Sequence, residues 1–500
     1  MFKRASGVLM HISSLPGRFG IGTLGKDAFK FVDFLAASGQ SYWQTLPLCP
    51  ISEKGCNSPY QSSSAYAGNE LFIDLELLCE WGFLSSQDYE GIDYSDESKV
   101  DYTSLYKTRQ RIFIKLFKNF CSAIPEDFYK FCNKNSAWLE DYALFMAIKE
   151  QSSNKDFHLW SNGIRHREQN CLNRWKKGCE KTVLYHKMLQ YFFFKQWYRL
   201  KSYANQKGIK IIGDVPIYVS LDSADVWANP KLFLLNSELK PTVVSGCPPD
   251  SFSKNGQLWG NPTYDWDELK KQGYNWWIER IKFSLKLCDV VRIDHFRAFD
   301  SYYCIPYTAK NAKAGCWQKG PGMDFINALK EELPDAAIIA EDLGFLTESV
   351  KELLSTSGFY GMKVLQFAFD SRESNDYLPY KYKENSVVYT GTHDNDTILG
   401  WEKYAKREDV AYAKKYLRTE NLGEGMMAAA LASPCNLCIL TMQDILSLGA
   451  SARMNIPGTK DGNWEWRCTE KQLLGVSSFL LDNTKLYGRI KKGKNLYEAT

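Results

Sequence analysis

No apolar run in this sequence of 500 residues is long enough to cross a membrane. The chain begins MFKRASGVLMHISSLPG, and the apolar stretch before His11 has only about four residues, far fewer than the apolar segment of a secretory signal. We therefore expect no membrane partner, no export and a cytoplasmic location.

The sequence also lacks a large excess of positive or negative charge. The 62 basic and 58 acidic residues leave a formal net charge of only +4. A nucleic-acid-binding protein usually carries a strongly basic stripe or patch, so we expect no nucleic-acid partner. A neutral ligand needs no such field, and the balanced charge is compatible with one.

A second Cys/His pair at zinc-ribbon distance is missing beside Cys435-x-x-Cys438, the one cysteine pair with metal or redox spacing. We expect this pair to be structural, with a metal or redox site as the alternative. The 14 cysteines are expected to be free thiols in a reducing compartment. No cofactor and no metal are predicted.

Aromatic residues, by contrast, are abundant: 15 Trp, 29 Tyr and 28 Phe. Most are expected in a large core. A minority are candidates for flat platforms that stack on sugar rings, since such side chains combine an apolar face with a wet edge.

Strand-like apolar runs that end in polar residues recur along the chain, with amphipathic helical stretches such as 27–38 and 411–419 between them. Parallel strands that are buried on both faces have this near-continuous Val/Ile composition. Eight strand–helix units predict an α/β fold of the (β/α)8 TIM-barrel type. The eight runs are SGVLMHISS, SYWQTLPL, GIKIIGDVPIYV, CDVVRIDHF, AAIIAEDLG, GMKVLQFAFD, NSVVYTGTHDND and NLCILTMQDIL.

The spacing of these runs is uneven. Residues 49–207 are predicted to form a helical insertion subdomain over the carboxyl face of one catalytic barrel domain, 1–500. A second insertion, 221–286, contains the stretch GCPPDSFSKNGQLWGNP, which has no helical or strand periodicity. Long loops in compact domains are often lids, so we interpret 246–262 as an active-site lid loop, with plain surface as the alternative.

Three carboxylates follow apolar runs directly: Asp294, Glu341 and Asp394. The carboxyl ends of barrel strands carry the chemistry of this fold, so the three are expected to converge. Arg292 shares a strand face with Asp294 and should lower its pKa, whereas the apolar run before Glu341 should raise the pKa of that acid. An ionised Asp and a protonated Glu about 5–5.5 Å apart are the pair of a retaining glycosidase.

Other interpretations of these acids stay open. Each carboxylate alone is more often a strand-end cap or an ion-pair partner. Acids on strand ends also bind Mg²⁺ in some barrels, although a fixed cation such as Arg292 would repel the metal. His393 and His11 are candidates for hydrogen bonds to sugars. His295, on the opposite face from Asp294, is expected to support the site without acting in catalysis.

The chain resembles the amylomaltases, the 4-α-glucanotransferase or disproportionating-enzyme family of the α-amylase clan. The resemblance spans nearly the whole chain, up to DGNWEWR. The blocks SPYQ, GQLWGNP and GNWEWR are specific to the family, whereas RIDH and THDND are shared by the whole clan. The matching blocks include SPYQSSSAYAGN, GDVPIYVS, GQLWGNPTYDW, VVRIDHFR, AEDLG, YTGTHDND and MQDILSLGASARMNIPGT.

The resemblance implies transfer of α-1,4-glucan segments between maltooligosaccharides by a retaining double displacement. Asp294 would be the nucleophile, Glu341 the general acid/base and Asp394 the acid that stabilises the transition state. Further residues are expected to contact the substrate: Arg292, His393, Tyr60, Asp214, Trp259, Asp250, Phe252, Asn463 and Asp370. No C-terminal β-sandwich is expected, and the protein should be a monomer or a weak homo-oligomer.

Four residues depart from the family pattern: Ala298, Thr441, Cys247 and Ser251. None of them is one of the three acids. The alternatives to a transferase are an α-1,4-glucan hydrolase of the same clan and a non-catalytic glucan-binding protein. The sequence does not fix the preferred chain length or the formation of cyclic glucans.

Overall fold

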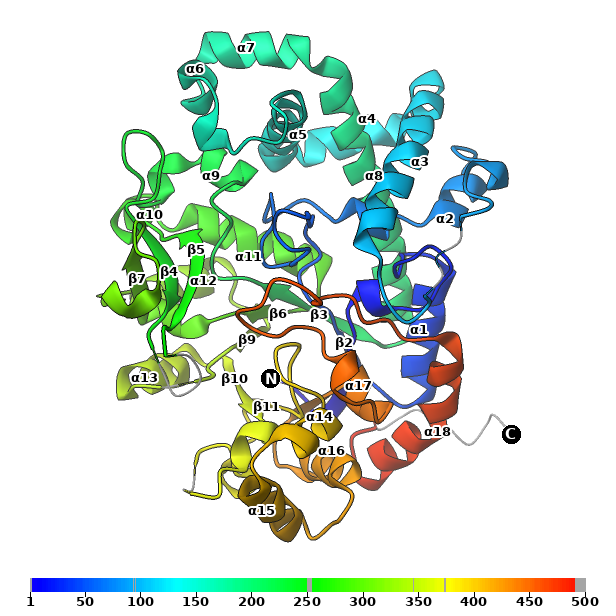
Figure 1. The fold of residues 1–500 in the computed structure, drawn as a ribbon, viewed down its shortest axis with the longest axis vertical. Coiled ribbons are helices and arrows are strands. Elements are labelled where there is room, and N and C mark those ends of the chain that lie inside the picture. The colour runs from blue at the N-terminus through cyan, green and yellow to red at the C-terminus, as the bar shows by residue number, and fades with distance from the viewer. Residues whose placement is uncertain are drawn as a thin grey trace.

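A closed barrel of eight parallel strands forms the centre of the molecule in the computed structural model, which describes residues 2–92, 94, 96–249, 254–344, 346–372 and 375–490 (Figure 1). Around the barrel the order is β1-β12-β11-β10-β9-β6-β3-β2. The predicted TIM barrel is confirmed, and each of the eight predicted runs supplies one strand. The strands are β1 (Ala5–Leu9), β2 (Tyr42–Gln44), β3 (Lys210–Val215), β6 (Val290–Ile293), β9 (Ile338–Ala340), β10 (Tyr360–Val364), β11 (Ser386–Tyr389) and β12 (Leu437–Thr441).

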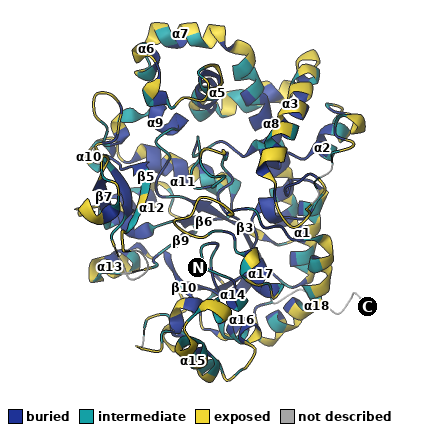
Figure 2. Ribbon diagram, viewed as in Figure 1, coloured by how far each residue is buried: buried dark blue, intermediate teal, exposed yellow. Residues whose placement is uncertain are grey.

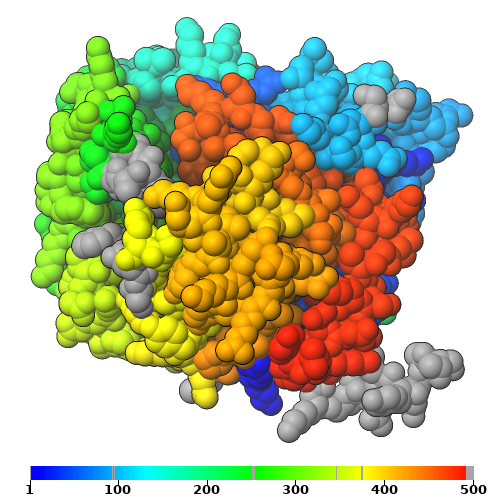
Figure 3. Space-filling view, turned by 60° about the horizontal axis from the view of Figure 1, so that its bottom comes forward, coloured from blue at the N-terminus to red at the C-terminus, as the bar shows by residue number. Residues whose placement is uncertain are grey.

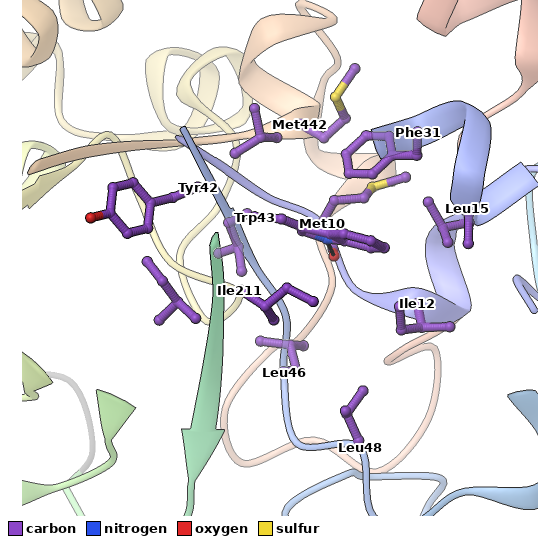
Figure 4. Close-up of a cluster of buried hydrophobic side chains, with 14 of the residues drawn as sticks. Met10, Ile12, Leu15, Phe31, Tyr42, Trp43, Leu46, Leu48, Ile211 and Met442 are labelled. Atoms are coloured by element: carbon purple, nitrogen blue, oxygen red, sulfur yellow. Dashed lines mark hydrogen bonds between the residues drawn. The ribbon is translucent and has the colours of Figure 1, made fainter. Parts of the chain in front are cut away.

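The barrel strands are buried on both faces, as their composition requires (Figure 2). Figure 4 shows part of this core, where Trp43 of β2 lies among Met10, Phe31 and Ile211. The Trp43 indole N–H donates to the Met10 carbonyl at 2.7 Å, so this large ring is buried without an unpaired donor.

Helices surround the barrel. The helix α1 (Lys26–Ala37) buries Phe31, Val32 and Leu35 and packs against α8 (Glu180–Gln206) and α18 (Glu470–Leu486). Further helices of this layer are α11 (Asn275–Leu287), α12 (Gly322–Glu332), α13 (Glu348–Ser357), α14 (Ile398–Tyr404), α15 (Arg407–Leu417) and α16 (Leu422–Ala432).

Residues 49–207 are largely helical in the described ranges. The predicted helical patterns at LYKTRQRIFIKLFKNF and VLYHKMLQYFFFKQWYRL lie in α3 and α8. Because α8 contacts the barrel strand β3, the last helix of the predicted insertion also covers the barrel. Before α8 come α2 (Leu75–Glu80), α3 (Tyr102–Ser122), α4 (Glu126–Lys134), α5 (Ser136–Gln151), α6 (Asn162–Arg165) and α7 (Gln169–Gly178).

Residues 221–286 contain more regular structure than the sequence suggested. Both ends of the predicted lid loop are strands, β4 (Val243–Cys247) and β5 (Gln257–Pro262), which pair antiparallel. With β7 (Ser301–Pro306) and β8 (Cys316–Lys319) they form a second, four-stranded sheet that the sequence analysis missed. The interpretation of 246–262 as aperiodic is therefore wrong at its two ends, 246–247 and 257–262, and holds for the described residues 248–249 and 254–256; residues 250–253 lie outside the described residues. The segment begins with α9 (Ala224–Ala228) and ends with α10 (Trp266–Lys271) and α11.

After β12 the described residues form α17 (Met442–Ile445), the 3-10 helix η10 (Ala450–Ala452), α18 and connecting loops, and no β-sandwich follows the barrel in this part of the chain. Figure 3 shows the yellow and orange surface of this last third of the chain on one face, beside the green surface of the middle third. Within the described ranges, no helix is both long and apolar enough to cross a membrane.

Candidate active site

Carboxyl ends of neighbouring barrel strands bring the predicted acids together. Asp214 lies in β3 and pairs in register with Arg292 of β6. Asp294 follows β6 by one residue, and Glu341 follows β9, the next strand around the barrel. Since parallel strands end at the same edge, these four side chains come from three adjacent strands at one mouth of the barrel.

Arg292 joins two of these carboxylates. Its Nη1 donates to both Asp214 oxygens at 2.8 and 2.7 Å, and its Nη2 donates to Asp294 Oδ1 at 3.0 Å. The Tyr60 hydroxyl donates to Asp214 Oδ2 at 2.7 Å. The Asp214 side chain is fully buried, whereas that of Asp294 keeps 28% of its surface exposed. The arrangement fixes Asp214 and leaves Asp294 facing the open mouth.

Burial dominates the ionisation of Asp294. It raises the pKa of this carboxyl to about 7, against the opposing charge of Arg292 and with the help of the nearby Asp214 and Glu341. Arg292 does lower the pKa of Asp294, as predicted, but burial outweighs it, so the net shift is upward and not downward. Arg292 also makes two of its three carboxylate hydrogen bonds to Asp214, whose charge repels Asp294.

Glu341 is held by backbone donors. The His295 N–H donates to Oε2 at 2.6 Å and the Leu343 N–H to Oε1 at 3.1 Å. Burial raises the pKa of Glu341 above its usual value, although Arg292 and these two N–H groups oppose the shift, so the predicted direction is confirmed. His295 has a left-handed backbone, φ 51°, which costs free energy in a non-glycine residue and turns its N–H toward Glu341.

Asp394 follows β11 and lies beside His393, with His393 Nε2 and Asp394 Oδ1 3.4 Å apart. The Asn455 side-chain amide donates to the same Oδ1 at 2.6 Å. The Tyr60 ring stacks on His393 with centroids 5.0 Å apart, and Trp464 lies 5.9 Å from Tyr60. Tyr60 therefore connects this aromatic group to the pair of Asp214 and Arg292.

The remaining predicted contacts lie in different places. The Trp259 ring, in β5, meets the ring of His295 edge to face at 4.9 Å, which brings the β4–β5 hairpin against the acids. The Asn463 side-chain oxygen Oδ1 accepts from the Ile456 N–H at 2.9 Å and thus shapes the loop that carries Asn455. Asp370 pairs with Arg372 and makes no hydrogen bond to the acids among the described residues, so the structure does not bring it into the cluster. Asp250 and Phe252 lie outside the described residues.

Two contributors escaped the sequence analysis as individual residues, Asn455 and Trp464, whereas His295 was expected to support the site and does so through its backbone N–H. Asn455 and Trp464 are in the matching blocks MNIPGT and GNWEWR, which was the available signal. His11 lies with His393 around one small cavity, and its Nδ1 is 3.1 Å from Thr45 Oγ1. Burial lowers the pKa of His11 to about 3, so this imidazole is neutral at physiological pH.

The donor set does not resemble a cation site. The described residues contain no group of three or more His, Cys, Asp or Glu side chains arranged to hold a metal ion. Between Asp214 and Asp294 lies the guanidinium of Arg292, a fixed positive charge in the place where a cation would be bound.

A (β/α)8 barrel with two carboxyl groups of raised pKa at its mouth and aromatic rings beside them defines a barrel enzyme suited to acid/base and nucleophilic chemistry on glycosidic bonds.

Comparisons with known proteins give the family. Residues 10–472 match the family described as 4-alpha-glucanotransferase. The 4-alpha-glucanotransferase of Streptococcus pneumoniae is 49% identical over 500 residues, covering 98% of this chain and 99% of that protein. The one of Clostridium butyricum is 47% identical over 487 residues, 96% of this chain and 100% of that protein. The fold is similar to amylomaltase from Streptococcus agalactiae in complex with acarbose, with TM-score 0.95, 43% identity and coverage of 98% and 100% of the two chains. The chain belongs to the 4-alpha-glucanotransferase family.

Proposed function

We propose that this enzyme transfers α-1,4-glucan segments between maltooligosaccharides by a retaining double displacement, with Asp294 as nucleophile and Glu341 as general acid/base. The observation that carries the proposal is the pairing of two acids held differently on adjacent strands. Asp294 is bound on one oxygen by Arg292, and Glu341 is bound by two backbone N–H groups.

In the first half of the reaction, Asp294 attacks the anomeric carbon of the donor while Glu341 gives its proton to the leaving glycosidic oxygen. The bond from the sugar to the leaving glucan breaks as the bond to the Asp294 carboxylate forms. The raised pKa of Glu341 supports its role, because this acid must hold a proton near neutral pH.

In the second half, the 4-hydroxyl of another glucan attacks the glycosyl–Asp294 ester, and Glu341 removes its proton. The configuration at the anomeric carbon is inverted twice and therefore retained. Asp394, oriented by Asn455, is proposed to hold hydroxyl groups of the reacting sugar. Tyr60 is proposed as a stacking platform beside it.

Transfer requires an acceptor that outcompetes water, which is present in bulk at about 55 M. We propose that the 246–262 segment is the lid that favours the acceptor, supported by the contact of Trp259 with His295 beside Glu341. The helical range 49–207 and the range 221–286 are proposed as insertions on the barrel. The protein is proposed to be a monomer or a weak homo-oligomer. None of the described cysteines forms a disulfide, which supports a cytoplasmic location.

Maltotriose tests this function. The purified protein is incubated with maltotriose alone, and chain lengths, free glucose and total reducing ends are followed. We expect longer maltooligosaccharides and glucose at a constant number of reducing ends, because transfer conserves them. A rise in reducing ends with only shorter products would instead identify a hydrolase, and no product at all would favour a glucan-binding protein.

A further inference from the structure

A cleft of about 640 Å³ lies away from the acids, between the helices α4, α5 and α8 on one side and α9 and α11 on the other (Figure 1). Aromatic rings form part of its wall, and the loop residues Ser64 and Tyr66 contribute to it. These rings include Tyr66, Phe131, Trp138, Phe194, Tyr198 and Phe283. This cleft plays no part in the mechanism above.

The aromatic wall has the form of a platform. The rings of Tyr66 and Trp138 are nearly parallel, with an interplanar angle of 13° and centroids 6.3 Å apart. Trp138 also packs against Phe283, and Tyr198 extends the wall with 40% of its surface exposed. Large rings with one supported and one accessible face are suited to ligands that have flat apolar faces.

Polar groups line the same cleft. Asp225 is 5% exposed and accepts a hydrogen bond from the Ala65 N–H at 2.8 Å, and the amide side chains of Asn229 and Asn275 also belong to the lining. Hydroxyl groups at the edge of a ligand would find both donors and acceptors here.

The lining carries no net charge. It contains four lysines, Lys130, Lys134, Lys195 and Lys286, and four acids, Asp127, Asp141, Asp225 and Glu279. Asp127 and Lys195 already pair at 2.9 Å. A site for a phosphate-bearing ligand would show an excess of positive charge, so the balance favours a neutral ligand.

Taken together, we infer that this cleft binds a segment of an α-1,4-glucan, as a second site remote from the acids. The inference rests on the proposed function, which supplies this class of ligand. The loop that contributes Tyr66 and Ser64 to the cleft also carries Tyr60, which bonds to Asp214 in the acid cluster. Tyr60 and Tyr66 are six residues apart, and six residues of fully extended chain span at most about 20 Å. The cleft and the acid cluster are therefore no farther apart than about 20 Å at these two residues. A long glucan held in the cleft stays close to the barrel mouth between transfers.

Tyr198→Ala and Trp138→Ala test this site. In an Asp294→Asn background, which stops turnover, the affinity for amylose is measured by affinity gel electrophoresis and titration calorimetry. We expect each substitution to weaken amylose binding about three- to ten-fold, the loss of one stacked ring, and Trp138→Phe to restore most of it. Tyr129→Ala, at an exposed tyrosine of α4 outside the cleft, is the matched control and should change nothing.

A second measurement separates this inference from the proposed function. With Asp294 intact, Tyr198→Ala should leave maltotriose disproportionation within about two-fold of the unaltered protein and raise KM for amylose, because a trisaccharide needs only the acid cluster. An amylose affinity equal to that of Tyr129→Ala in both Tyr198→Ala and Trp138→Ala would overturn the glucan cleft. Absence of any maltotriose reaction in the unaltered protein would instead overturn the proposed function.

Discussion

One arginine, Arg292, binds two carboxylates at the mouth of the barrel. It donates two hydrogen bonds to Asp214 and one to Asp294. Burial then raises the pKa of Asp294 to about 7, so this carboxyl group is partly protonated near neutral pH in the free site. A bound sugar must find Asp294 ionised and Glu341 protonated.

The pH profile of Asp214→Asn tests how the Asp214 charge affects the pKa of Asp294. Ionised Asp294 is needed for attack, so kcat/KM of the unaltered protein should rise with pH through an apparent pKa near the value of about 7. Removing the Asp214 charge takes away a repulsion that raises the pKa of Asp294, so the acid limb should move to lower pH. The maximal rate should fall by up to about 10²-fold, because Arg292 and Tyr60 lose their anchor. An acid limb that stays in place would show that the Asp214 charge does not raise the pKa of Asp294.

Glu341→Gln and Asp294→Asn should differ in the donors that they accept. With maltotriose, both should lose activity by about 10³-fold or more. With an α-maltosyl fluoride donor, whose leaving group needs no proton, Glu341→Gln should still release fluoride and Asp294→Asn should not. Fluoride release measured with an ion-selective electrode checks this. Equal loss in both variants would reverse or remove the assigned roles.

At this scale the sequence predicted which acids converge, because each follows an apolar run that had to be a buried strand. It did not predict the pKa of Asp294. That pKa depends on Asp214, 80 positions earlier in the chain, and only the pairing of β3 with β6 puts Asp214 beside Arg292. The support of Asp394 by Asn455 is likewise a tertiary contact between two loops.

At the scale of elements, the β4–β5 hairpin is the part that brings the predicted lid to the acids. Gly256 lies at its turn with φ 66°, and a side chain there would come within 2.4 Å of the Cys247 carbonyl. The sequence analysis found no alternation of apolar and polar residues in this stretch. The two strands are short, and the Gly and Pro residues in and between them interrupt the pattern. The eight barrel strands were easier to predict, since burial on both faces leaves long Val/Ile runs.

Trp259→Ala tests the lid. Loss of the ring that contacts His295 should expose the glycosyl intermediate to water and raise the ratio of hydrolysis to transfer several-fold, while total donor cleavage changes less. Reducing ends per mole of cleaved maltotriose report the ratio. Trp317→Ala, at an exposed tryptophan of β8 in the same sheet, serves as control. A ratio that is unchanged in Trp259→Ala would exclude Trp259 from the lid.

For the molecule as a whole, buried carboxyl groups should make folding stability depend on pH. Burial raises the folded-state pKa of Asp225 from its usual value of 3.8 to about 6. The folded state therefore binds more protons than the unfolded state between about pH 4 and 6, and this group lowers the stability as pH rises through that window.

Asp225→Asn removes this titration. Between pH 4 and pH 8, the contribution of Asp225 should make the free energy of unfolding of the unaltered protein fall by about 1–3 kcal/mol more than that of the variant. Urea unfolding of both proteins at both pH values measures this difference. The same pH dependence in both proteins would mean that Asp225 ionises in the folded state as it does in the unfolded chain.

The barrel fold could be predicted from the sequence because its strands follow one another around the barrel in chain order. Counting eight strand–helix units along the chain is therefore enough to predict it. The second sheet could not be predicted, since β7 and β8 lie between two barrel strands in the sequence and have no signal that separates them from a loop. Where the insertions begin and end is equally hidden, because α8 and α11 belong by their contacts to the barrel.

The glycosyl–enzyme ester tests the central claim most directly. Glu341→Gln is mixed with an α-maltosyl fluoride whose terminal 4-hydroxyl is replaced by hydrogen, so that it cannot act as an acceptor. Peptide mass spectrometry then locates the attached sugar. We predict a maltosyl group on the peptide that contains Asp294, bound as an ester that base cleaves. An adduct on Asp394 or on another residue, or fluoride release with no adduct at any time, would contradict the double displacement at Asp294.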